Sequence, residues 1–235
     1  MSNICKLMNY NFGAAKKTIF IALEIFGAMW LITILTSFQF ISLLPVACAS
    51  MVFEPVFINE NKNNAKKVMG ILPIKRYEYI LSRYILLTVT VIVFGVISFA
   101  IIKISDHITF FDMAELFKIN VMAGTDTDIS ISYVGMTLCL GLCLGAIEFF
   151  CRFVFSADKA SLAIIAIMMI SIIAFDAVLY LVSGDLETML DTLNNLPVTM
   201  AKRPYKFAGT AVLIGLIVDI VFCVLSTVVV NKKEI

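Results

Sequence analysis

The sequence predicts an all-α membrane protein with six transmembrane helices, and three observations support this fold class. Hydrophobic residues make up 61% of the chain and charged residues only 15%, against roughly 45–50% and 25% in soluble domains. The hydrophobic residues lie in runs of about twenty, long enough for a helix to cross a hydrocarbon core of roughly 30 Å. Lys and Arg concentrate between alternate runs. Because lipid offers the backbone no hydrogen-bond partners, these runs must be helices.

The hydrophobic runs are taken as one six-span transmembrane domain over residues 1–235. The predicted spans cover residues 18–38, 39–58, 84–104, 132–155, 160–182 and 209–230. The first two adjoin and should form a tight helical hairpin, and Pro45 and Pro55 should kink the second span. The first run lacks a small-residue cleavage pattern, so we interpret it as a retained span and not as a signal peptide.

Positive charge orients the spans relative to the membrane. With an inner amino terminus, most of the 18 Lys and Arg residues fall in inner segments, and the cluster Lys202, Arg203 and Lys206 is the exception. We therefore expect a multi-pass protein with both termini in the cytoplasm. The net charge of +1 gives no field that would attract nucleic acid. None of the six cysteines lies in a predicted outer loop, so no disulfide is expected.

An amphipathic pattern precedes the first span. Ile4, Leu7, Met8 and Phe12 recur at helical spacing with polar residues between them. This pattern predicts a short interfacial helix on the inner leaflet, and the alternative is a frayed terminus.

The longest inner loop, residues 59–83, is the most polar part of the chain and the only inner loop long enough to dock a partner. Pro73 suits the first position of a helix, where its missing N–H would be unpaired in any case. Ile74, Tyr77, Leu81 and Tyr84 then share one face. The loop is therefore predicted to end in an amphipathic cytoplasmic helix that continues into the third span.

Residues 72–84 read LPIKRYEYILSRY. This stretch resembles the LP-I-x-R-x-E-Y-V-x-x-R-Y motif of permease subunits in bacterial type-two ABC exporters, where the motif also lies between the second and third spans. Ile80 stands where that motif has Val, which is a conservative change. The resemblance implies a non-enzymatic permease subunit in a bacterial plasma membrane. It also implies a second permease, identical or paralogous, and two separate ATPase subunits that bind ATP and Mg.

The resemblance further implies that the loop holds a coupling helix seated in a cleft of the ATPase. The residues assigned to this coupling are Leu72, Pro73, Ile74, Arg76, Tyr77, Glu78, Leu81, Arg83 and Tyr84. Its apolar members should bury against the ATPase or the bases of the spans, and its charged members should fix the register. The plainer interpretation is that the charges only hold the topology and the tyrosines lie at the membrane interface. The implied substrate is an exported amphipathic peptide or hydrophobic compound.

Three acidic residues, Glu24, Asp176 and Asp219, interrupt the first, fifth and sixth spans. A charge at membrane depth costs at least ~2.5–3.5 kcal/mol, so each of these side chains must face protein, water or a partner. They are candidates for lining a translocation path. The alternatives are hydrogen bonds between helices, or snorkelling toward a helix end.

The fourth span carries candidates for helix packing. Gly141 and Gly145 form a small-xxx-small stripe that would let another helix approach closely. Glu148 and Arg152 stand four residues apart in the favourable order for an ion pair within a helix.

Two rival functions use the same residues. An intramembrane peptidase could use Glu148 and Arg152, but the single histidine, His107, lies in a predicted outer loop, so no His-based metal site is expected. An ion-coupled secondary transporter could use Asp176 and Asp219 as ion sites. The sequence has no G-x-x-x-x-G-K-[ST] motif, so any ATP would bind another chain. No catalytic residue and no cofactor is assigned to this chain.

Overall fold

The computed structural model describes residues 3–36, 39–54, 57, 75–105, 127–155, 157–183 and 202–232. Within these ranges every regular element is a helix, which confirms the all-α class for the part described. The elements there are α1 (Asn3–Thr36), α2 (Gln39–Ala47), the 3-10 helix η1 (Ala49–Phe53), α5 (Arg76–Ser105), α7 (Thr127–Val154), α8 (Ala157–Ser183) and α10 (Pro204–Lys232).

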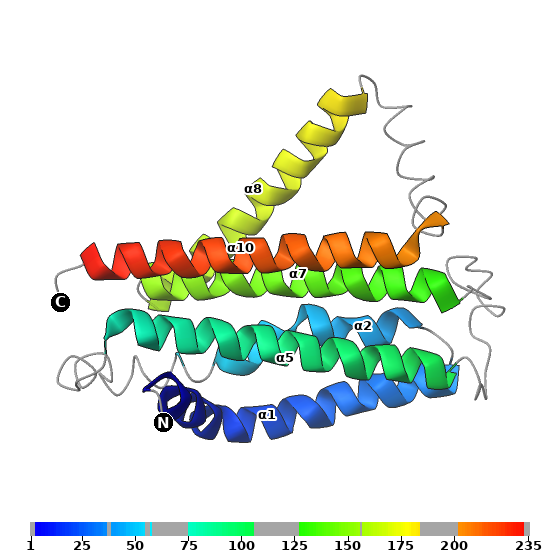
Figure 1. Ribbon diagram of the computed structural model, residues 1–235, viewed down its shortest axis with the longest axis horizontal. Helices are drawn as coiled ribbons and strands as arrows, with labels where there is room; N and C mark the ends of the chain where they lie inside the picture. The colour runs from blue at the N-terminus through cyan, green and yellow to red at the C-terminus, as the bar shows by residue number, and fades with distance from the viewer. Residues whose placement is uncertain are drawn as a thin grey trace.

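Four long helices, α1, α5, α7 and α10, run along a common axis, and α2 and η1 pack against α1, α5 and α7 (Figure 1). Among the described residues, four stretches are long and apolar enough to span a membrane: Ala15–Leu35, Arg76–Ser105, Ser130–Val154 and Pro204–Lys232. They correspond to the first, third, fourth and sixth predicted spans. The fifth predicted span falls in α8, which leaves the bundle at an angle (Figure 1). The count of six spans stays a prediction.

The second predicted span is not one kinked helix. Helix α2 ends at Ala47, the chain turns at Cys48, and η1 follows. Pro45 lies inside α2, where its ring supplies no N–H and crowds the preceding turn. Elsewhere in α2, the carbonyl of Ser42 accepts hydrogen bonds from the indole Nε1 of Trp30, at 3.4 Å, and from the hydroxyl of Ser98. These bonds connect α2 to α1 and to α5.

Helix α1 is continuous through the boundary at which we predicted a separate interfacial helix. It buries one stripe, with Leu7, Ala15, Phe26 and Trp30 facing the bundle. Phe12, a member of the predicted apolar face, is exposed instead. A location on the inner leaflet stays a prediction.

Small residues on α7 set how closely its neighbours approach. A Cβ added at Gly141 would lie 2.6 Å from the carbonyl oxygen of Val46 in α2, and one at Gly145 would lie 2.8 Å from the Leu87 side chain in α5. On another side of α7, a Cβ at Gly135 would lie 2.5 Å from the Cα of Ala208 in α10. These glycines let α7 occupy the centre of the bundle.

Candidate coupling site

The end of η1 and the start of α5, which border the undescribed part of the predicted coupling loop, lie toward one end of the bundle, where α1 begins and α10 ends (Figure 1). Leu72, Pro73 and Ile74 fall outside the described residues. The residues on both sides of its undescribed part are described: Glu54 and Phe57 on one side, and α5, which takes in the end of the predicted loop, on the other. We call these the two flanks of the loop. The site is therefore built from these flanks and from the helix ends around them.

Helix α5 begins at Arg76, and Glu78 caps it. Oε2 of Glu78 accepts a hydrogen bond from the backbone N–H of Lys75 at 3.2 Å. A carboxylate here satisfies a donor that the helix leaves unpaired, and it complements the positive end of the helix dipole. The observed contact of Glu78 thus fixes where the helix starts.

Arg83 lies one turn further along α5 and is fully buried. Its guanidinium carbon lies 4.9 Å from the ring centroid of Phe57 and 5.3 Å from that of Tyr79. Its Nη2 donates to the Tyr79 hydroxyl at 3.2 Å. A desolvated contact between a cation and an aromatic ring contributes about 2 kcal/mol or more. Arg83 therefore joins the two flanks, because Phe57 lies on the first flank and Tyr79 lies on the second, in α5.

The same aromatic rings continue into α7. The ring of Phe57 packs edge-on against Phe149, at 5.1 Å between centroids, and against Phe153, at 5.5 Å. Tyr79 also packs edge-on against Phe153, and Tyr84 packs against both phenylalanines. Edge-to-face pairs of this kind contribute about 0.5–1.5 kcal/mol each beyond their buried area. Both flanks of the loop are thus fixed to the end of α7.

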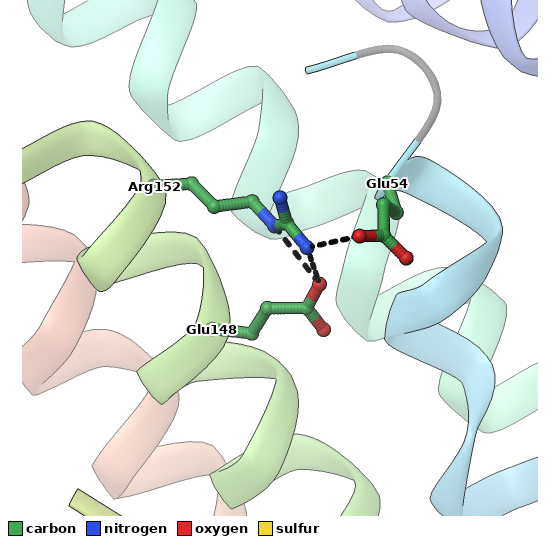
Figure 2. Close-up of polar contacts among 3 residues, drawn as sticks. All are labelled: Glu54, Glu148 and Arg152. Carbon is green, nitrogen blue, oxygen red and sulfur yellow. Dashed lines mark hydrogen bonds and ion pairs between the residues drawn. The ribbon is translucent and has the colours of Figure 1, made fainter. Parts of the chain in front are cut away.

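Arg152 adds a charged connection at the same place (Figure 2). Its Nη2 lies 2.9 Å from Oε1 of Glu54 and 3.0 Å from Oε1 of Glu148, to which Nε also donates at 3.0 Å. Its guanidinium carbon lies 5.8 Å from the Phe57 ring centroid. The carboxylates differ in environment, because the Glu148 side chain is 11% exposed and that of Glu54 is 43% exposed. The Glu148 contact is therefore the less hydrated of the two.

We call this group of contacting side chains the loop-base cluster. Its members are Glu54, Phe57, Tyr79, Arg83, Glu148, Phe149, Arg152 and Phe153.

The first turns of α5 also contact the remaining long helices. Nη1 of Arg76 donates to the carbonyl of Val230 near the end of α10 at 3.4 Å. Nδ2 of Asn11 in α1 donates to the hydroxyl of Ser82 at 3.1 Å. The Tyr84 hydroxyl donates to the Ala146 carbonyl of α7 at 3.3 Å. A displacement of this segment therefore reaches α1, α7 and α10.

The residues assigned to coupling divide into two groups by exposure. Arg76 is exposed, as is Tyr77 with 43% of its surface accessible, so both can reach a partner. Arg83 and Tyr84 are buried in the chain's own core. Leu81 is half-buried. The buried members can affect docking only through the residues that they position.

Sequence reasoning missed Phe57 and the contact between Glu54 and Arg152. The pairing of Arg152 with Glu148 was visible from their spacing of four residues. Glu54 is 98 positions away from Arg152, and no local pattern connects two residues so far apart. The signal that could have helped was an acidic residue at the inner end of one span and a basic residue at the inner end of another.

The three intramembrane acids have different environments. Glu24 is exposed on α1. Asp176 lies in α8, and its side chain is outside the described part. Asp219 is buried and faces α5, where its Oδ2 lies 2.8 Å from the Thr88 hydroxyl. Over the residues described, no three His, Cys, Asp or Glu side chains are grouped to hold a metal ion.

Comparison with known proteins gives one match. The model of a protein family described as ABC-2 family transporter protein matches residues 6–232. No curated protein and no solved structure matches the chain.

Proposed function

The chain belongs to the ABC-2 family of transporter proteins, and from this premise we propose that it is the permease subunit of an ATP-driven exporter whose coupling segment is residues 59–83. A family match over residues 6–232 and four long apolar helices make it a membrane protein and a permease of an ABC transporter. ATP hydrolysis then takes place on another chain.

The loop-base cluster is the observation that carries this proposal. A coupling segment must transmit a force, so its ends have to be connected rigidly to the helices that move. Phe57 and Glu54 on one flank, and Tyr79 and Arg83 on the other, contact the end of α7 through aromatic and charged side chains. The cation–π and aromatic contacts of both flanks are buried, so pulling a flank away would break them and expose their side chains. The Arg152–Glu54 pair is partly hydrated and contributes less.

The proposed partners follow from the same arrangement. Two ATPase subunits, each holding ATP and Mg, would contact the exposed Arg76 and Tyr77. A second permease, identical or paralogous, would complete the translocation path. The substrate would be an amphipathic peptide or a hydrophobic compound, a proposal supported by the few charged side chains in the described middle of the helices.

Substitution of Tyr77 tests the proposed coupling. The chain would be coexpressed with its proposed ATPase partner, copurified and reconstituted in liposomes, and ATP hydrolysis and export would be measured together. Tyr77→Ala removes an exposed aromatic side chain, and such anchors dominate docking energies, so we expect at least a tenfold loss of export. Val96→Ala is the matched control, because Val96 lies on the same helix and is also exposed, but it lies away from the loop.

Three results would contradict the proposal. Equal export by Tyr77→Ala and wild type would remove the coupling role of this segment. Ion-driven flux by the chain alone, without ATP, would favour a secondary transporter. Peptide cleavage by the pure chain would favour an intramembrane peptidase.

A further inference from the structure

Asp219 is a carboxyl group inside the bundle, and its environment does not suit a charge. It is 5% exposed and lies in α10 opposite α5. One oxygen, Oδ2, contacts Thr88. The other oxygen, Oδ1, is buried and has no hydrogen-bond partner among the described residues.

The groups around Asp219 are electrically neutral in their ordinary states. The titratable side chains that face it are Tyr84 from α5, Cys143 from α7 and Cys223 from α10 itself. Arg152, which forms ion pairs with Glu54 and with Glu148, is not among the groups that face Asp219. An isolated ionised carboxylate in apolar surroundings is so costly that such groups bind a proton instead.

The hydrogen bonds of Thr88 also indicate that Asp219 carries a proton. The hydroxyl oxygen of Thr88 lies 2.9 Å from the Tyr84 carbonyl oxygen and 2.8 Å from Oδ2 of Asp219. A threonine hydroxyl carries one hydrogen, and a carboxylate has none to donate. An ionised Asp219 would therefore leave one of these two close oxygen pairs without a hydrogen. A proton on Oδ2 supplies both bonds, because Asp219 then donates to Thr88 and Thr88 donates to Tyr84.

We propose that Asp219 is a proton-binding site, which holds one proton on Oδ2 while α5, α7 and α10 are packed as in this structure. The proton makes the carboxyl neutral and completes the chain of hydrogen bonds from α10 to the backbone of α5. Its release requires these helices to separate and admit water. Raising the pH therefore weakens the contact between α5 and α10, and lowering the pH leaves it intact. The proton site requires neither an ATPase nor a substrate.

Infrared spectroscopy of the full chain in lipid bilayers tests the proposal. At neutral pH, the spectrum of wild type minus that of Asp219→Asn should contain the carbonyl band of a protonated carboxylic acid. Wild type minus Glu54→Gln should lack this band, because Glu54 is partly hydrated and forms an ion pair with Arg152. The thermal unfolding temperature of wild type should fall on alkalinisation by more than that of Asp219→Asn, whose amide cannot ionise.

A second variant keeps the test informative if Asp219→Asn does not fold. Thr88→Val preserves the shape of the side chain but removes the acceptor for the Asp219 proton, so the acid band should move to higher frequency. The proposal is overturned if the spectrum shows an ionised Asp219, with no acid band lost in Asp219→Asn, or if Thr88→Val leaves the acid band unmoved.

Discussion

Arg152 shows how one side chain can connect three segments. It reaches Glu54 at the end of η1 and Glu148 on its own helix, and its guanidinium lies against Phe57. Arginine suits this position because its planar fork can donate to two carboxylates at once. Lysine would keep the positive charge but would lack the planar guanidinium that donates to both carboxylates. The arginine therefore determines how the segment before the loop is held against α7.

Truncation of Arg152 should be costly for stability. Arg152→Leu leaves two carboxylates facing each other, and removing one partner of a buried pair costs about 3–5 kcal/mol, reduced here because Glu54 is partly hydrated. Arg152→Lys should lose less. Thermal unfolding of the reconstituted protein measures both effects.

The two glutamates provide an internal control for this prediction. Glu148→Gln should destabilise more than Glu54→Gln, because the pair with the more exposed Glu54 contributes only about 0–1 kcal/mol. Equal losses from the two variants, or a stable Arg152→Leu, would mean that the ion pairs do not hold the cluster together.

Among the single helices, α7 has the central position in the bundle. It packs against α2, α5, α8, α10 and η1, and it can do so because glycines replace larger side chains where its neighbours come closest. Gly135 is the most restricted of these, since the obstruction is the backbone of Ala208 and not a movable side chain. A methyl group there would have to push α10 away.

Alanine substitution of two helical glycines should therefore have opposite consequences. Gly135→Ala should destabilise the protein by several kcal/mol, as overpacking against a rigid neighbour does. Gly27→Ala should be neutral or slightly stabilising, because nothing lies within 4 Å of a Cβ added there and alanine favours a helix by up to about 1 kcal/mol. Unfolding temperatures of the two variants decide this, and a stable Gly135→Ala would show that α7 and α10 are not so close.

The long helices could be predicted from the sequence because length and hydropathy are local properties. The end of α2 at Ala47 could not, since Pro45 is compatible with either a kink or a break. Only part of the loop-base cluster could be predicted from the sequence. The spacing of Glu148 and Arg152 gave one pair, but the tertiary fold alone brings Phe57 to both arginines.

At the scale of the whole molecule, both ends of the described chain lie at the same end of the bundle as the start of α5, where the described part of the coupling segment begins (Figure 1). Such an arrangement places the chain ends beside the expected ATPase. Which side of the membrane this end occupies is a prediction from the distribution of Lys and Arg.

Thiol labelling tests the predicted orientation. Cys5 is exposed on the first turns of α1, so a membrane-impermeant maleimide should label it in inside-out vesicles and not in intact cells. His107→Cys, in the predicted outer loop, should behave in the opposite way. In a background with the other cysteines replaced, labelling of Cys5 from outside the cell would reverse the proposed topology.

Phe57 has a consequence for how the base of the loop can move. Its ring lies against the guanidinium of Arg83 on one flank and that of Arg152 on α7, so one benzyl group serves two cations. Rotation of that ring would remove the aromatic contact of Arg152 and one of the two aromatic contacts of Arg83 at the same moment. The two arginine contacts of Phe57 should therefore be lost together and not one by one, while Tyr79 still holds Arg83.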